Sequence, residues 1–156
     1  MSIVRLEDVP EHTTTVAGWI YGEWERYRPN RLIGHTEGAL KTVADTTGLP
    51  LSFVALQGNE PVGIARLVKH DMESREDLSP WLSAVFVPAQ HRGSGIGTRL
   101  CAKIVDEATM VGFSAIYLFT RDRESFYTKQ GWKVLERTIY REKEVVVLTM
   151  RTGDHG

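Results

Sequence analysis

Hydrophobic and polar residues follow two different periods along this chain, and each period predicts a different kind of element. Runs with apolar residues at alternate or successive positions predict strands at 3–6, at two places within 51–70, and at 81–87, 114–120, 132–140 and 145–150. Apolar residues three or four positions apart predict helices at 13–24, 36–47, 96–111 and 122–130. Because strands and helices are interspersed, the pattern predicts a mixed α+β fold.

Cap and turn residues set the expected boundaries of these elements. Thr36 is placed to cap the second helix, which Gly48 then ends. Gly131 can take the left-handed conformation that closes the fourth helix. We expect residues 1–150 to form a single domain and residues 151–156 to form a frayed C-terminal tail.

The composition is that of one ordinary globular domain. The chain has 156 residues, enough to bury roughly two thirds of the surface that its unfolded form exposes. Its 19 basic and 20 acidic residues leave a net charge of -1. This balance gives no reason to expect a nucleic acid or an anionic membrane as a partner.

We expect neither a secretory signal nor a membrane-spanning segment in this chain. Its first fifteen residues include acids and a proline before any sustained apolar run, which argues against a secretory signal. No stretch reaches the roughly 18 consecutive apolar residues of a transmembrane helix. The single cysteine, Cys101, excludes an intramolecular disulfide and any multi-cysteine metal site. We therefore expect a cytoplasmic protein without a bound metal.

A glycine-rich turn stands between the predicted strand at 81–87 and the helix at 96–111. Gly93, Gly95 and Gly97 fall within five positions. A strand, such a turn and a helix start in series leave several backbone N–H groups unpaired beside the positive end of the helix dipole. Glycines let a bulky phosphate approach these groups, and Arg92 adds a positive charge. The stretch therefore predicts an anion-binding site.

The spacing of the glycines excludes the common nucleotide-binding loops. A dinucleotide fingerprint needs a third glycine at its sixth position, where this chain has Thr98 or Leu100, depending on the register. A Walker A loop needs four residues between its glycines and then Gly-Lys-Ser/Thr, and the chain contains no such run. Two alternatives stay open at this point: another kind of phosphate-binding turn, or a tight strand-to-helix turn with no ligand.

The turn resembles the pyrophosphate-binding signature of the GNAT superfamily of acyl-CoA-dependent N-acetyltransferases, Q/R-x-x-G-x-G/A. In the register that we prefer, the signature runs from Arg92 to Gly97, and Ile96 stands at the start of the apolar helix face. A second register, from Gln90 to Gly95, also matches. A second block, SFYTKQGWKV, is similar to the family's stretch in which a tyrosine precedes a Lys-x-Gly-aromatic turn, and it puts Tyr127 on the family's general-acid position. The residues that match the preferred register are Arg92, Gly93, Ser94, Gly95, Ile96 and Gly97.

The resemblance implies both a fold and an acyl donor. The fold is a central, mostly antiparallel sheet of about six to seven strands whose central strands splay apart, flanked by about four helices. The donor is acetyl-CoA. Its pyrophosphate would accept hydrogen bonds from the N–H groups of residues 93 to 98, which end at Thr98. Its pantetheine arm would pair with free backbone groups around Val85, Phe86 and Val87, as an added strand pairs with a sheet edge.

The reaction that the resemblance implies is direct attack of a primary amine on the thioester in a ternary complex. Only the neutral amine attacks, and deprotonating a lysine-like amine of pKa about 10.4 at pH 7 costs roughly 4.6 kcal/mol. Many relatives place a glutamate base on the signature strand, but 81–87 contains none. The base stays open among nearby residues that are otherwise solvated surface groups: Glu23, Glu25, His70, Asp71, Glu73 and Asp77.

Four other side chains carry a functional and a structural alternative. Tyr127 can donate a hydrogen bond to the departing thiolate, because a phenol of pKa about 10 stays protonated at neutral pH. The alternative is that it only packs beside its aromatic neighbours. Trp24 and Tyr27 are candidates for the acceptor pocket or for core packing. Cys101 is expected to be a core residue rather than a nucleophile.

Three classes of function stay open from the sequence. The first is an acetyl-CoA-dependent N-acetyltransferase, and the second is a non-catalytic acyl-CoA-binding or sensing module on the same fold. The third is an interaction protein that keeps only the scaffold. Tyr127 argues against the second class and the intact glycine turn against the third. The expected acceptor is a small-molecule or peptide amine, and the protein is expected to be a monomer or a homodimer.

Overall fold

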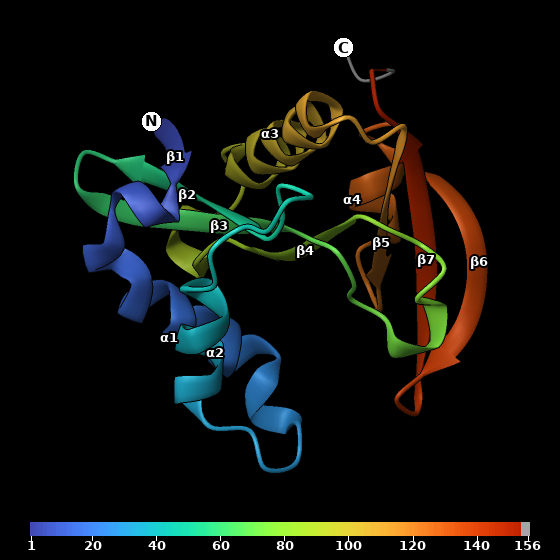
Figure 1. Cartoon of the computed structure of the whole chain (residues 1–156), viewed down its shortest axis with the longest axis horizontal. Helices are drawn as coiled ribbons and strands as arrows, with labels where there is room; N and C mark the ends of the chain where they lie inside the picture. Colours follow the sequence, from blue (N-terminus) through green and yellow to red (C-terminus); the bar gives the residue numbers. More distant parts are fainter. Residues whose placement is uncertain (154–156) are drawn as a thin grey trace.

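The computed structural model describes residues 1–153, which contain one seven-stranded sheet (Figure 1). The strand order is β1-β2-β3-β4-β5-β7-β6, and every neighbouring pair is antiparallel except the parallel pair β4 and β5. The strands are β1 (Ser2–Arg5), β2 (Leu51–Gln57), β3 (Glu60–Val68), β4 (Trp81–Phe86), β5 (Ala115–Thr120), β6 (Lys133–Tyr140) and β7 (Lys143–Arg151). The strand with apolar residues on both faces, β4, is in the middle, as the sequence predicts.

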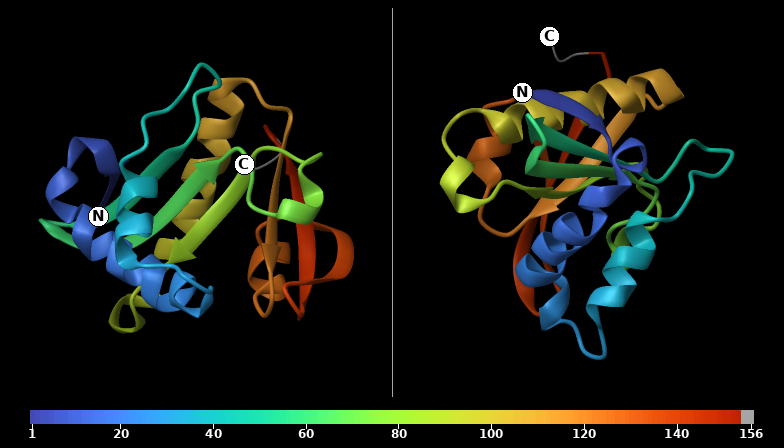
Figure 2. Two further views of the ribbon diagram at one scale, coloured as in Figure 1. Left: turned by 60° about the horizontal axis from the view of Figure 1, so that its bottom comes forward. Right: turned by 90° about the vertical axis from the view of Figure 1, so that its left-hand side faces the viewer.

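Within residues 1–153, four α-helices cover the two faces of the sheet (Figures 1 and 2). On one face, α3 buries Ile96, Leu100 and Ile104. On the other, α1 buries Val16 and Ile20. None of the described helices is long and apolar enough to cross a bilayer. The helices are α1 (Thr13–Glu23), α2 (Ile33–Leu40), α3 (Ile96–Val111) and α4 (Glu124–Thr128).

The two central strands meet at one end and then separate (Figure 1). Trp81 of β4 pairs with Tyr117 of β5, and the Tyr117 N–H donates to the carbonyl of Pro80 over 3.0 Å. No other residue pair joins these strands in the described part of the chain. The predicted splay is thus confirmed, and it leaves the β5-facing edge of β4 open to an extended ligand.

A β-bulge at Ala84 changes which side chains of β4 share a face. Ile64 of β3 pairs with Phe86 and Arg66 pairs with Ser83, so β4 advances three residues where β3 advances two. Ala84 takes a left-handed φ of 56° at this point. As a result, Ser83 and Phe86 lie on the same face of the sheet, the one that α1 covers.

The second helix differs from its prediction at both ends. The sequence predicts it at 36–47 with Thr36 as its cap, but it runs over Ile33–Leu40 and Thr36 is buried inside it. Beyond the helix, the Asp45 carboxylate accepts a hydrogen bond from the Thr47 N–H over 2.7 Å. Side chains that bond to the nearby backbone in this way favour a turn over a continued helix, which explains the early end.

The last strand extends into the segment predicted as a frayed tail. Arg151 ends β7 and pairs with Ala115. The Thr152 hydroxyl then donates to the carbonyl of Phe113 over 2.6 Å. The sheet therefore continues by one residue, and Thr152 is held by the carbonyl groups that follow α3. The rest of the predicted tail, from 154 to 156, lies outside the described residues.

Candidate active site

The glycine-rich turn joins the end of β4 to the start of α3. Gly93 and Gly95 both have a φ of 85°, a left-handed conformation that costs an L-residue roughly 1–2 kcal/mol. Gly95 directly precedes Ile96, the first residue of α3, whose side chain is buried. The backbone path of the turn therefore requires glycine at both positions.

Six successive backbone N–H groups at this turn have no hydrogen-bond acceptor within residues 1–153. They run from Gly93 to Thr98, whereas the N–H groups of Arg92 and Arg99 on either side are bonded to backbone carbonyls. The last three of the six belong to the first turn of α3, where the helix dipole is positive. The turn is therefore a backbone site for an anion of the size of a pyrophosphate.

Gly97 serves packing as well. A Cβ at this position would lie 3.3 Å from the ring of Phe126, which is on α4. That distance is tighter than ordinary van der Waals contact, so the missing side chain lets α3 and α4 approach each other. The third glycine of the signature thus has a reason that does not involve a phosphate.

The polar side chains of the turn bond to the chain itself. The Arg92 Nε donates to the carbonyl of Val87 over 2.8 Å, and its guanidinium lies 5.6 Å from the centroid of the Phe86 ring. The Ser94 hydroxyl donates to the carbonyl of His91 over 3.1 Å. Arg92 therefore braces the turn against the end of β4, and its positive charge stays at the junction of strand and turn.

The three residues expected along the pantetheine arm are anchored by their side chains. Val85 and Val87 pack against the core on the α3 side of the sheet. Phe86 packs against the core on the α1 side. Because these contacts use the side chains, the backbone edge that faces β5 stays free for pairing.

Tyr127 is buried on α4 and is 8% exposed. Its ring centroid lies 5.0 Å from that of Phe126 and 6.2 Å from that of Trp132. Its hydroxyl makes no hydrogen bond to any group within residues 1–153. Burial raises the pKa of Tyr127, so the phenol stays protonated. The structure combines aromatic packing with a hydroxyl that remains available as a donor.

Cys101 has the properties of a core residue. It is buried on the sheet side of α3. Burial raises the pKa of its thiol to about 12, so the thiolate needed for nucleophilic attack is not populated at neutral pH.

Aromatic side chains border the end of β4. The Trp24 ring centroid lies 6.4 Å from that of Phe86, and Trp24 is 39% exposed. Tyr27 is 69% exposed, with the Arg26 guanidinium 4.7 Å from its ring centroid. Trp24 therefore packs partly against the end of β4, whereas Tyr27 lies on the surface.

Asp71 is the candidate base whose carboxylate is turned inward. Its Oδ1 accepts a hydrogen bond from the Ser83 hydroxyl over 3.1 Å. Burial raises the pKa of Asp71 to about 6, although the Ser83 hydrogen bond and the charges of Arg66 and Arg141 act in the opposite direction. A carboxylate with such a pKa is ionised at neutral pH and can still accept a proton.

The other candidate bases face solvent. Glu23 and His70 are exposed. The remaining carboxylates are each bound to an arginine. The pairs are Glu25 with Arg28 at 3.4 Å, Glu73 with Arg141 at 2.8 Å, and Asp77 with Arg75 at 3.0 Å.

Four side chains at this opening were not singled out from the sequence. Ser83 is the one hydroxyl in the strand WLSAVFV, and Arg66 interrupts the apolar run IARLV, so both carried a signal as polar residues in strands. Arg28 and Arg141 carried no signal of their contact with Glu73, because Glu73 is distant from both in the sequence. Only the fold brings them to the same opening.

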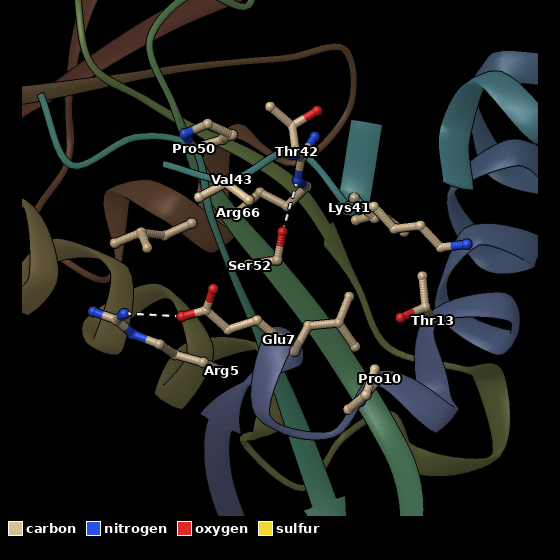
Figure 3. Close-up of a pocket in the computed structure, with 13 residues that line it drawn as sticks. Arg5, Glu7, Pro10, Thr13, Lys41, Thr42, Val43, Pro50, Ser52 and Arg66 are labelled. Atoms are coloured by element: carbon tan, nitrogen blue, oxygen red, sulfur yellow. Dashed lines mark hydrogen bonds and ion pairs between the residues drawn. The ribbon is translucent and has the colours of Figure 1, made fainter. Parts of the chain in front are cut away.

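A separate cavity of about 220 Å³ lies between the start of α1, the end of α2 and β2 (Figure 3). At its wall, the Arg66 Nε donates to the Ser52 hydroxyl over 2.9 Å. At its rim, Arg5 and Glu7 form an ion pair at 3.1 Å. None of the site residues predicted from the sequence lines it, although Arg66, whose charge lowers the pKa of Asp71, is part of its wall.

Solved structures with a similar fold are acetyltransferases. An aminoglycoside 6'-N-acetyltransferase complexed with coenzyme A has a TM-score of 0.78 at 15% identity, over 100% of this chain and 99% of that one. The aminoglycoside 6'-N-acetyltransferase from Enterococcus faecium has a TM-score of 0.74 at 15% identity, over 100% and 99%. An acetyltransferase from Streptococcus agalactiae has a TM-score of 0.69 at 19% identity, over 96% and 97%. At these identities the likeness establishes the fold.

The family follows from the sequence match. A comparison with curated proteins gives no match. The family model described as "Acetyltransferase (GNAT) domain" matches residues 50–134, which is more than half of the chain. The matched segment contains β4, the glycine turn, α3 and Tyr127. The chain therefore belongs to the GNAT family of acetyltransferases, as its glycine turn and tyrosine block predict.

Proposed function

We propose that this protein is an N-acetyltransferase that moves an acetyl group from acetyl-CoA to a primary amine by direct attack in a ternary complex. The observation that carries the proposal is the row of six free N–H groups from Gly93 to Thr98, next to the open edge of β4. An anion site and an unpaired strand edge in series match a ligand with a diphosphate at one end and an amide-rich arm behind it.

The donor side of the proposed site consists mainly of backbone groups. The diphosphate would accept hydrogen bonds from the N–H groups of residues 93 to 98. The pantetheine arm would pair along Val85 to Val87. Acetyl-CoA supplies the thioester carbonyl that the amine attacks. The coenzyme A bound in one structural neighbour and the acetyl-CoA bound in another support this choice of donor.

On the acceptor side, we assign the general base to Asp71. The amine must lose its proton before or during attack, and removing it into bulk water at pH 7 costs roughly 4.6 kcal/mol for an amine of pKa about 10.4. Asp71 is ionised at neutral pH and lies beside β4 through its bond to Ser83. It takes the role that many relatives give to a glutamate on the strand itself.

On the leaving-group side, Tyr127 donates a hydrogen bond to the sulfur of coenzyme A as the C–S bond breaks. Its hydroxyl is free of protein partners within residues 1–153, and its raised pKa keeps the proton on the phenol oxygen. A hydrogen bond of this kind stabilises the developing thiolate without full proton transfer.

Two measurements test the proposed function. Release of the coenzyme A thiol from acetyl-CoA is followed with a panel of amines, and the melting temperature is measured with and without coenzyme A. We expect amine-dependent thiol release and an increase in melting temperature. A stabilising effect of coenzyme A without turnover on any amine would support the non-catalytic binding module. No effect of coenzyme A at all would contradict the assignment of the glycine turn.

A further inference from the structure

Glu73 joins three segments at the opening beside β4. Its Oε1 lies 2.8 Å from Nη2 of Arg141, in the turn between β6 and β7, and 3.6 Å from Nη2 of Arg28, which precedes α2. Its own N–H donates to the hydroxyl of Tyr140 over 3.3 Å. One carboxylate oxygen is thus shared between two guanidinium groups that are far apart in the sequence.

The ion-paired side chains around Glu73 form a cluster that is positive on balance and that offsets the negative charge of Asp71 beside it. We call it the mouth cluster, and it has three arginines and two glutamates, which sums to one surplus positive charge. Both glutamates are already bound to arginine, so a polycationic acceptor finds no unoccupied carboxylate in the cluster. The residues of the mouth cluster are Glu25, Arg28, Arg31, Glu73 and Arg141.

The mouth cluster lies next to the proposed base. Arg141 lowers the pKa of Asp71 and Glu25 raises it, so charges of the cluster act on the carboxylate that would receive the amine proton. Asp71 also directly precedes Met72 and Glu73 in the chain. An acceptor whose amine reaches Asp71 therefore brings its neighbouring groups within the field of these arginines.

The bond that holds Glu73 is weak enough to be exchanged. The Glu73 side chain is 74% exposed, and the two arginine side chains are 29% and 36% exposed. Ion pairs with this much solvent contact contribute little to stability, because water and side-chain entropy offset the attraction. A carboxylate delivered by a bound ligand could take over the same two guanidinium groups at small cost.

We propose that the acceptor is a small amine that also carries a carboxylate, and that this carboxylate replaces Glu73 between Arg28 and Arg141. The proposal rests on the proposed function and names the class of acceptor that the same site prefers. Arginine suits this role because its planar N–H groups match the two oxygens of a carboxylate. In the free protein, the Glu73 carboxylate occupies the position that the substrate carboxylate would take.

The test compares amino acids with the corresponding amino-acid amides, which differ at the carboxylate, and adds kanamycin as a polycationic amine. We expect wild-type kcat/KM to be higher for at least one amino acid than for kanamycin. In Arg141→Gln and Arg28→Gln, we expect the ratio of acid to amide to fall at least about tenfold, through a higher KM for the acid alone. Comparing ratios between variants removes the different intrinsic reactivities of the two amines.

Two further variants sharpen the result. Glu73→Gln removes the competing carboxylate, so the KM for the amino acid should fall while the KM for the amide stays the same. Arg137→Gln is the matched control, because Arg137 pairs with Glu124 and takes no part in the mouth cluster. It should leave the ratio of acid to amide unchanged.

The outcomes separate this proposal from the one on which it rests. Acetylation of amines with no change of the acid-to-amide ratio in Arg141→Gln or Arg28→Gln would overturn the carboxylate proposal alone. A preference for kanamycin over every amino acid would do the same. Acetylation of no amine at all would overturn the proposed function and this proposal together.

Discussion

The Asp71 carboxylate accepts a hydrogen bond from the Ser83 hydroxyl, with 3.1 Å between Oδ1 and Oγ. This bond ties the connection between β3 and β4 to the central strand, within the face of the sheet that the bulge at Ala84 rearranges. It holds a half-buried carboxylate beside a strand that contains no glutamate.

We expect Asp71→Asn to lower kcat/KM by about 100-fold or more, because removal of a general base typically costs 10²–10⁴-fold. In the wild type, kcat/KM should fall as the pH drops through about 6, where Asp71 becomes protonated. The Asp71→Asn variant should not show this decrease of kcat/KM near pH 6. The check is a pH profile of initial rates at saturating acetyl-CoA.

Asp77→Asn provides the control for this experiment. Asp77 is exposed and bound to Arg75, and it is one of the acids that the sequence also offered as a base. It should keep the wild-type profile. An Asp71→Asn enzyme with normal rates and an unchanged acid limb would remove Asp71 from the mechanism.

Asp71→Asn should also increase the stability of the fold at high pH. The pKa of Asp71 is raised from 3.8 to about 6 in the folded state, so between these values the folded state binds more protons than the unfolded state. Stability therefore falls as the pH rises through this window. Because asparagine cannot ionise, Asp71→Asn should be more stable than wild type at pH 8, on the order of 2–3 kcal/mol, and about equal below pH 4.

Urea unfolding of both proteins at pH 8 and at pH 3.5 measures this difference. A variant that is less stable than wild type at pH 8 would show that the ionised carboxylate stabilises the fold, contrary to the argument from burial.

Gly95→Ala and Gly95→Glu separate two requirements of the turn: a left-handed backbone conformation and free space for the diphosphate. Gly95 has a φ of 85°, so alanine should cost roughly 1–2 kcal/mol of stability through backbone strain alone. No atom outside the turn lies within 4 Å of a Cβ at this position, so overlap adds nothing. Glutamate adds bulk and a negative charge where the diphosphate is expected, and it should abolish coenzyme A binding.

The matched control is Gly34→Ala in α2, where a Cβ also has open space but the φ is not left-handed. It should raise the stability slightly, because alanine favours the helix by about 1 kcal/mol over glycine. Isothermal titration with coenzyme A and thermal unfolding give both readouts. Wild-type affinity in Gly95→Glu would place the coenzyme elsewhere.

Tyr127→Phe should change activity and stability in opposite directions. The buried hydroxyl has no partner within residues 1–153, and burying such a group costs about 1–3 kcal/mol. Its removal should leave the melting temperature unchanged or higher. Turnover should fall at least about tenfold while coenzyme A binding persists, because the donor to the leaving thiolate is lost.

Tyr21→Phe is the comparison for stability, because its hydroxyl donates to the carbonyl of Arg31 over 3.2 Å. It should lose about 1 kcal/mol. If Tyr127→Phe instead lost stability and kept normal turnover, the hydroxyl would be a structural group with a partner, and the leaving-group role would be wrong.

Elements with a repeated pattern could be predicted well. Helix α3 follows from apolar residues at regular helical spacing, of which Ile96, Leu100 and Ile104 are buried against the sheet. The second helix was misplaced because its ends depend on single local hydrogen bonds, such as the one from Thr47 to Asp45, which compete with the helix over a few residues.

The site divides in the same way. Gly93 and Gly95 could be identified from the sequence because a left-handed turn at a helix start requires glycine, and this requirement is local. Gly97 was assigned to the phosphate alone, but its contact with Phe126 depends on how α3 and α4 pack.

Local patterns in the amino-acid order predict the backbone side of the site: the order of strands and helices, the glycine turn that exposes N–H groups, and the family that uses them. The tertiary structure decided the acceptor half. It turns the Asp71 carboxylate toward Ser83, which is the basis for our proposal of Asp71 as the base, and it joins Arg28 and Arg141 through Glu73. The reason is physical: backbone conformation follows from neighbours along the chain, whereas the burial and pairing of charges depend on residues that only folding brings together.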